Sequence, residues 1–324
     1  MPKVSVIIPV YNVERYIGRC VQTLFGQTLD DMEFVFVNDC TPDRSMEVVA
    51  EVLEVFPHRK AQVKIVDLPV NGGLHAARRA GLAVATGEYI AHCDSDDYVD
   101  IDIYRLLWQR AVESGSEMVY CSFLSGPAGR MKPFVEDLRP QMEPHWLMRE
   151  LGMGKLLGVL WRMLVHRRIY EAVAHWPVAD MAEDHVVHHQ LLFACRTKVV
   201  WLDKALYCYV RRPDQMTGAR SRERVLNNVT QRVANLAPMA VFYGQTGLPF
   251  AKAVITKYKM NDNMLLSRLE GEGDYVELQR ALHPELPLLA ALCTRGLKRK
   301  YRRAYLRMQC RLLKKKAIAL THTS

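Results

Sequence analysis

The sequence has 324 residues, of which 49% are apolar and 24% are charged, and its formal net charge is +9. This composition is typical of a globular protein with a large core and two or three packed units. No segment approaches the roughly 20 apolar residues of a membrane-spanning helix, which argues against an integral membrane protein. The first apolar run is broken at Pro9 and is too short for a signal peptide, so we expect a cytoplasmic protein.

The positive charge is concentrated near the end of the chain. Eleven of the 44 Lys and Arg residues lie between Arg295 and Lys316, a stretch without any acidic residue. The remaining 33 nearly balance the 35 Asp and Glu residues, so the rest of the chain is close to neutral. The eight cysteines are scattered without a CxxC pair, which indicates reduced, packed thiols rather than disulfides or a zinc site.

Strand and helix patterns alternate four times in the first hundred residues. Apolar runs predict strands at residues 4–10, 33–38, 63–66 and 89–93. Apolar residues spaced three and four apart predict helices at residues 14–25, 45–55 and 74–85. The short connections favour parallel strands joined by right-handed crossovers, and the fold class is therefore α/β.

Polar residues follow each of these four strands. They are Tyr11 and Asn12, then Asp39, then Asn71, and finally residues 94–97. In open α/β sheets ligands bind beyond the carboxyl ends of the strands, so we expect these side chains to gather at one edge. Taken singly, each is an ordinary turn residue.

Three carboxylates lie within four residues, at Asp94, Asp96 and Asp97, and they repel one another. A hard divalent cation such as Mg²⁺ or Mn²⁺ would compensate, because it prefers oxygen ligands and commonly bridges carboxylates to phosphates. The alternative is a solvated acidic turn that caps a helix starting near Asp100. This segment alone leaves both interpretations open.

The pattern becomes less regular after residue 99. We expect a helix at 103–113, a strand at 118–123, a hairpin or irregular loop at 125–144, a loop at 180–185 that enters a helix through Cys195, two paired strands at 199–202 and 205–210, and helices from 221 onward.

Together these segments resemble family 2 glycosyltransferases of the GT-A fold. The resemblance covers residues 3 to about 217 and rests on six blocks in the family's order: residues 4–12, residues 37–39 with Thr41 and Asp43, residues 71–74 with Ala77, Arg78 and Gly81, residues 94–98, Glu183 with Asp184, and Tyr209 with Arg211. It implies a Rossmann-like, mostly parallel sheet flanked by helices, with a helical extension. The resemblance divides the GT-A domain into a nucleotide-sugar-binding half at 1–98 and an acceptor and catalytic-base half at 99–219. A helical region is expected at 220–324.

The resemblance also implies roles for individual residues. The donor site would comprise Pro9, Tyr11, Asn12, Asp39, Asn71, Gly73, Arg78, Asp94, Ser95, Asp96 and Arg211 or its neighbour Arg212. Within that set, Asp94 and Asp96 would hold Mn²⁺ or Mg²⁺, and Asp184 would be the catalytic base. Cys40 stands where relatives usually carry glycine.

Glycosyl transfer from a nucleotide diphosphate produces an oxocarbenium-like centre and a strongly anionic leaving group. A metal ion on the diphosphate stabilises that charge, and a separate carboxylate takes the proton of the acceptor hydroxyl. We therefore expect an inverting, metal-dependent transferase that uses a UDP-sugar, with a surface polysaccharide or its lipid-linked intermediate as acceptor.

Two other functions compete with this one. A nucleotidyltransferase also binds a nucleotide on an α/β sheet, but it would carry a Gly-rich phosphate loop where this chain has Tyr11 and Asn12. A noncatalytic membrane- or nucleic-acid-associated protein on this fold would retain the acids as relics. For Asp184 itself, the alternative is an acidic first turn that favours the dipole of the following helix.

Histidines follow at once, and His185 and His189 share a helix face. No third ligand accompanies them, so we expect packed or surface histidines rather than a zinc site. In the basic tail, apolar residues repeat every three or four positions across residues 295–320. Such a helix suits an anionic membrane surface, with the inner face of the cell membrane as the expected location, and a helix docked on the body is the alternative. No nucleic-acid motif accompanies the charge, and no nucleic-acid partner is expected.

Overall fold

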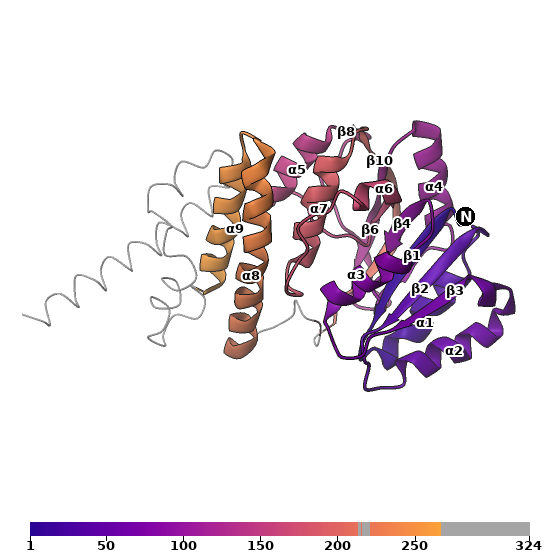
Figure 1. The fold of residues 1–324 in the computed structure, drawn as a ribbon. Helices are drawn as coiled ribbons and strands as arrows, with labels where there is room; N and C mark the ends of the chain where they lie inside the picture. Colours follow the sequence, from indigo (N-terminus) through magenta and orange to yellow (C-terminus); the bar gives the residue numbers. More distant parts are fainter. Residues whose placement is uncertain (213–214, 216–220, 267–324) are drawn as a thin grey trace, which may run out of the picture. The chain divides into compact units, whose positions relative to one another are not determined.

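The computed structural model describes residues 1–212, 215 and 221–266 (Figure 1). The chain forms two compact units. Among the described residues, the first comprises 1–148, 158–174, 187–212 and 215, and the second comprises 149–157, 175–186 and 221–266. The predicted basic helix at 295–320 lies outside the described residues.

The strands begin and end, in chain order, at β1 Val4–Val10, β2 Met32–Asn38, β3 Val63–Asp67, β4 Tyr89–His92, β5 Tyr98–Val99, β6 Met118–Gly126, β7 Lys132–Pro133, β8 Gln141–Met142, β9 Met163–His166 and β10 Val199–Val210. The helices are α1 Glu14–Phe25, α2 Ser45–Val55, α3 Leu74–Val84, α4 Ile103–Ser114, α5 Pro144–Gly152, α6 Arg167–Tyr170, α7 Glu183–Ala194, α8 Arg222–Thr246 and α9 Ala251–Leu266, with a 3₁₀ helix at Pro57–Gln62.

One mixed sheet organises the first unit. Its strand order is β3-β2-β1-β4-β9-β6-β10-β5, with β7 beside β6 and β8 beside β10. The four strands predicted from the first hundred residues are all present and pair in parallel. The predicted α/β architecture is thus confirmed, and parallel pairing places the carboxyl ends of β1, β2, β3 and β4 at one edge.

Apolar packing explains why β1 is an interior strand, between β2 and β4. All seven of its residues are buried, as expected for a strand covered on both faces. Helix α1 buries one stripe that ends at Phe25, whose ring meets Phe34 and Phe36 of β2 edge to face at 5.4 and 5.9 Å. On α3, a Cβ added to Gly81 would lie 2.5 Å from Ile7 of β1, so this close approach of helix to strand requires glycine.

Two predictions in the second half of the sheet were wrong or incomplete. Residues 199–210 form one long strand, β10, and not a pair of strands. The polar residues Asp203 and Lys204 resemble a turn in the sequence, but they are exposed at a bulge where the register with β6 shifts. Strand β9, which lies antiparallel between β4 and β6, was not predicted at all. The hairpin alternative for 125–144 is confirmed by the antiparallel pairing of β6 and β7.

The second unit contains two long helices, α8 and α9, which lie side by side (Figure 1). The Ser221 hydroxyl accepts a hydrogen bond from the backbone N–H of Arg224 and caps the start of α8. Gly247, with φ 65°, ends this helix in the left-handed conformation. Among the described helices, none has the length and apolarity needed to cross a membrane.

Candidate active site

The residues that follow the four parallel strands do gather at one edge of the sheet. Pro9 lies inside β1 opposite Val37 of β2, so the ends of these two strands are in register. Tyr11 and Asn12, just beyond β1, are exposed. The backbone N–H of Asn12, at φ 52°, donates to the Thr41 hydroxyl at 2.8 Å and joins the loop after β1 to the loop after β2. The loops after β1 and β2 therefore lie together at this edge, as predicted.

Asp39 fixes the glycine loop after β3. The side chain is buried, and its two carboxylate oxygens accept hydrogen bonds from the backbone N–H groups of Gly72 and Gly73 at 2.7 and 2.9 Å. Gly73 has φ 84°, and a Cβ on Gly72 would lie 2.8 Å from that of Ala76. Both glycines are thus required by the backbone, and Asn71 is left exposed at the tip of the loop.

A second carboxylate, Asp43, holds the loop after β1. It accepts hydrogen bonds from the backbone N–H of Glu14 and the hydroxyls of Thr41 and Ser45. Burial alone would raise the pKa of Asp43, but the hydrogen bonds from Ser45, Thr41 and Glu14 outweigh burial and lower this pKa to about 2. Ser45 was missed in the sequence, where it reads only as the first residue of a helix.

The acidic cluster lies at the same edge, after β4. Ligand oxygens of Asp94, Asp96 and Asp97 all lie within 4.8 Å of one another, which is a spacing that a single cation can bridge. Asp97 is buried and accepts hydrogen bonds from the Tyr207 hydroxyl at 2.9 Å and the Val210 N–H at 2.7 Å. These two hydrogen bonds join Asp97 to β10, while burial and the neighbouring acids raise the pKa of Asp97 well above its usual value. The assignment of a metal ion to Asp94 and Asp96 stays a prediction.

Two arginines pair with these acids. Arg78 of α3 is buried and binds Asp94 at 2.6 Å, and Arg212 binds Asp96. The Arg212 guanidinium also lies over the ring of Tyr16, 4.1 Å from its centroid. The backbone N–H of Arg211 donates to the carbonyl of Gly126, and the Arg211 side chain is exposed. Arg212, and not Arg211, is therefore the arginine at the acidic cluster.

Ser95, the remaining residue of the cluster, is 6% exposed. Its neighbour Cys93 is fully buried, and the Cys93 sulfur lies 3.8 Å from that of Cys20 on α1. The acidic turn therefore packs on buried residues. Within the turn, Asp94 and Asp96 are half-exposed.

Asp184 lies in the first turn of α7, within the second unit. Its neighbour Glu183 is buried, and Asp184 is half-buried. On the other side, the His185 imidazole pairs through Nδ1 with the Tyr258 hydroxyl at 2.7 Å. Burial, with the nearby Arg232 charge, lowers the pKa of His185 to about 4, so the ring is neutral at pH 7.

The other two histidines of this helix are packed in the first unit. His188 and His189 are fully buried, and His188 contacts the Tyr120 hydroxyl. Among the described residues, the acidic cluster after β4 is the group of side chains whose spacing suits a metal ion.

Solved structures of glycosyltransferases share this fold. S. aureus TarS, residues 1–349 in complex with UDP-GlcNAc, superposes with a TM-score of 0.67 at 20% identity, over 86% of this chain and 79% of that one. The mannosyltransferase PcManGT from Pyrobaculum calidifontis, in complex with GDP-Man and Mn²⁺, superposes with a TM-score of 0.56 at 17% identity, over 95% of this chain and 85% of that one. At these identities the similarity shows the fold, which is GT-A.

The sequence comparisons identify the family. Residues 5–155 match the model of glycosyl transferase family 2. An uncharacterized glycosyltransferase of Bacillus subtilis, EpsJ, is 33% identical over 224 residues, which is 67% of this chain. The match spans 63% of EpsJ, less than two thirds of that relative's length. The predicted family is thus confirmed, and the chain belongs to glycosyl transferase family 2.

Proposed function

We propose that the protein is an inverting, metal-dependent glycosyltransferase. It transfers a sugar from a nucleotide diphosphate, most simply a UDP-sugar, to a hydroxyl of a glycan or lipid-linked glycan. The observation that carries the proposal is the common edge of four parallel strands, where the loops tied to Asp39 meet the acids Asp94 and Asp96. A family 2 sequence match over this region supports the same assignment.

The donor nucleotide would bind over the loops after β1, β2 and β3. Asp39 sets the position of the glycine loop, and the exposed Tyr11, Asn12 and Asn71 border it. The complexes of neighbouring folds with UDP-GlcNAc and with GDP-Man support a nucleotide sugar as ligand. These two neighbours bind different nucleotides, so the base must be tested directly.

Asp94 and Asp96 would hold Mn²⁺ or Mg²⁺ against the donor's diphosphate. Their oxygens have a suitable spacing and half-exposed positions, and oxygen ligands are those these ions prefer. When bound, the ion supplies charge stabilisation to the departing nucleotide diphosphate. Arg78 and Arg212 now neutralise the same two carboxylates, and each guanidinium carries donors that suit phosphate oxygens as well.

Asp184 would act as the base toward the acceptor. Its carboxylate takes the proton of the acceptor hydroxyl as that oxygen bonds to the anomeric carbon and the bond from this carbon to the diphosphate breaks. A single displacement of this kind inverts the anomeric configuration. An NMR measurement of the product anomer tests this step, and a retained configuration would contradict it.

The acceptor proposed from the resemblance is a growing surface polysaccharide or its lipid-linked precursor, used in the cytoplasm at the inner face of the membrane. The basic segment 295–320 is the proposed contact with anionic lipid. Flotation of the full chain with vesicles containing anionic lipid tests this contact. A chain that stays with the soluble fraction in low salt would contradict it.

The donor site is tested first by a thermal-shift panel of UDP, GDP, CMP and dTDP, each with and without Mn²⁺. A ligand that binds only the native state raises the apparent stability by mass action. We expect UDP to raise the melting temperature, Mn²⁺ to increase that shift, and the Asp96→Ala variant to lose the increase. A larger shift with another nucleotide would change the donor, and no shift with any would contradict the proposed function.

A further inference from the structure

One buried amide on α8 binds the segment that leads to Asp184. Asn235 is 1% exposed. Its Oδ1 accepts from the backbone N–H groups of Val178 and Ala179 at 2.8 and 3.2 Å, and its Nδ2 donates to the carbonyls of Ala179 and Met181 at 2.6 and 2.9 Å. A primary amide has two donors and two acceptor lone pairs, so all four hydrogen bonds of this side chain are used on one short segment.

A second side chain of α8 binds the same segment. Gln231 lies one turn before Asn235, and its Oε1 accepts from the Met181 N–H at 3.1 Å. Residues four apart share a helix face, so both amides point toward the segment from one face of α8. Residues 175–182 form neither helix nor strand. The backbone groups of Val178, Ala179 and Met181 are therefore hydrogen-bonded to side chains of α8.

A strained residue connects this segment to the helix that carries Asp184. Ala182 has φ 64°, in the left-handed region that costs a residue with a Cβ about 1 kcal/mol or more. Such a conformation persists only where the surroundings determine it. Glu183 and Asp184 follow directly in the first turn of α7, so the direction in which this turn begins is set by Ala182.

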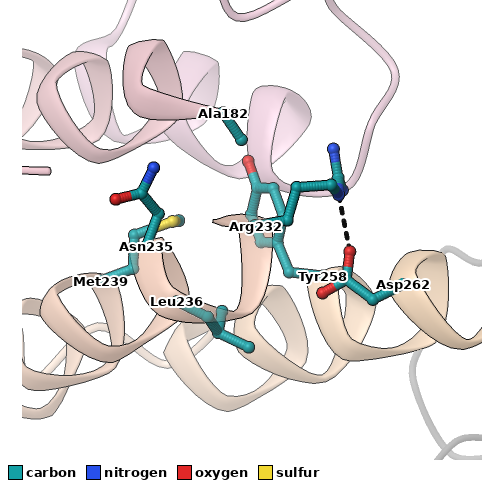
Figure 2. A pocket seen from close by; sticks show the side chains of 7 residues that line it. All are labelled: Ala182, Arg232, Asn235, Leu236, Met239, Tyr258 and Asp262. Atoms are coloured by element: carbon teal, nitrogen blue, oxygen red, sulfur yellow. Dashed lines mark hydrogen bonds and ion pairs between the residues drawn. The ribbon is translucent and has the colours of Figure 1, made fainter. Parts of the chain in front are cut away.

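The same helix pair also holds the residue that follows Asp184. Arg232 of α8 binds Asp262 of α9 at 2.7 Å, and Tyr258 of α9 contacts His185. Figure 2 shows Ala182 on one side of a small pocket and side chains of α8 and α9 on the other, with Asn235 and Arg232 among them. Side chains of α8 and α9 thus bind the chain on both sides of Asp184, at residues 178–181 before it and at His185 after it.

We propose that Asn235 is a positioning residue that sets the place of Asp184 through the segment 178–182. The inference rests on the proposed function, in which Asp184 is the catalytic base. A displacement of about 1 Å in a catalytic group can lower the rate by about a hundredfold, so a residue that fixes this backbone contributes to turnover without touching substrate. It gives the helical region after residue 220, which the family model at 5–155 does not reach, a part in catalysis.

Three variants of α8 form a graded series. Asn235→Ala removes four hydrogen bonds to the segment, Gln231→Ala removes one from a half-buried position, and Gln245→Ala removes the bond of Gln245 to His175, outside the segment. Turnover is followed as UDP release from UDP-GlcNAc, with cell membranes as the source of acceptor. Hydrogen exchange of the backbone at 178–186 is followed in parallel.

We expect turnover to fall about 10- to 100-fold in Asn235→Ala, a few-fold in Gln231→Ala and not at all in Gln245→Ala. KM for the donor and the thermal shift with UDP and Mn²⁺ should stay unchanged, because the loops after β1, β2, β3 and β4 that form the proposed donor site (the nucleotide edge) belong to the first unit and Asn235 belongs to the second. Exchange at 178–186 should rise in the same order, while exchange at 89–97 stays constant. A purely structural role would lower the melting temperature without this separation of turnover from KM.

The outcomes separate this inference from the proposed function. If Asp184→Asn turns over normally, the proposed base is wrong. If Asp184→Asn is inactive while Asn235→Ala keeps the full rate, or if exchange at 178–186 does not change, the positioning role is wrong and the base assignment stands. The milder Gln231→Ala variant keeps the test decisive if Asn235→Ala fails to fold.

Discussion

In both the nucleotide edge and the segment before Asp184, a buried side chain holds irregular backbone through hydrogen bonds, but the two side chains come from different kinds of position. At the nucleotide edge, Asp39 binds the backbone of Gly72 and Gly73, and each of these residue types is required by the local geometry. Before Asp184, the irregular backbone is held by Asn235, an amide on a helix more than fifty residues away. The glycine loop and Asp39 are recognisable as a motif in the sequence. Asn235, in contrast, is a single asparagine in an ordinary helical pattern.

The largest effects should come from Asp96 and Asp184, for which we propose different tasks: metal binding and proton removal. Asp96→Asn and Asp184→Asn should each lower turnover by about a thousandfold or more, as expected when charge stabilisation or the base is lost. Only Asp96→Asn should also abolish the Mn²⁺-dependent part of the thermal shift with UDP. A variant of Asp184 that loses donor binding would remove the distinction between the two regions.

The next effect tests how firmly the glycine loop depends on Asp39. Asp39→Asn replaces one acceptor with a donor and leaves one of the two N–H groups unpaired, which should cost about 2 kcal/mol of unfolding free energy. Asp67→Asn is the matched control, because Asp67 makes an exposed hydrogen bond with Asn38. We expect this control to change the free energy by less than about 0.5 kcal/mol in a denaturant titration. Equal costs would mean that burial of Asp39 has no consequence.

The nucleotide edge could be predicted from the sequence because each of its parts is local. A strand that ends in a polar turn is visible in a window of ten residues, and parallel pairing then brings four such turns together. The choice between Arg211 and Arg212 was not visible, because adjacent residues leaving β10 point in different directions. Strand β9 was missed because its apolar run is only three residues long and is flanked by Arg162, Arg167 and Arg168.

The surroundings of Asp184 could not be predicted for a different reason. Motif spacing singled out Asp184, but nothing in residues 222–246 distinguishes Asn235 from a solvent-exposed helix residue. Its burial follows from the packing of α8 with residues 178–181, which is a tertiary contact without periodic signal. The positive φ of Ala182 was equally hidden, since alanine rarely adopts it.

Another effect is the pH dependence of the unfolding free energy that comes from His185, the residue after Asp184. The pKa of His185 is about 4 in the folded protein, below the ordinary value near 6.5. The unfolded chain therefore binds more protons between these values, so the stabilisation is complete above pH 6.5 and is lost as pH falls toward 4. The loss should be about 3 kcal/mol by pH 4.

The variant His185→Gln should flatten this part of the stability profile, as measured by denaturant titrations at pH 4.5, 5.5, 6.5 and 7.5. His58→Gln, which makes the same substitution at an exposed position, is the matched control. An unchanged slope in His185→Gln would show that this imidazole is not held neutral by its surroundings.

The smallest effect compares one strained residue in each region. Cys40, with φ 55°, follows Asp39, and Ala182, with φ 64°, precedes the helix of Asp184. Glycine at either position relieves left-handed strain but adds freedom to the unfolded chain, so each variant should gain about 0.5 kcal/mol or less. In a domain of this size that gain is about 1–2 °C in melting temperature.

The two glycine variants should differ in the Asn235→Ala background, in which the hydrogen bonds of Asn235 to the segment 178–181 are removed. The turn at Cys40 is held locally, since the Asn38 side chain accepts from the N–H of Thr41 at 3.0 Å, so Cys40→Gly should behave the same with or without Asn235. Ala182→Gly should lower turnover further in the Asn235→Ala background than in the wild type, because glycine then leaves the direction of α7's first turn undetermined. Strictly additive effects on turnover would show that the strain at Ala182 and the amide of Asn235 act independently.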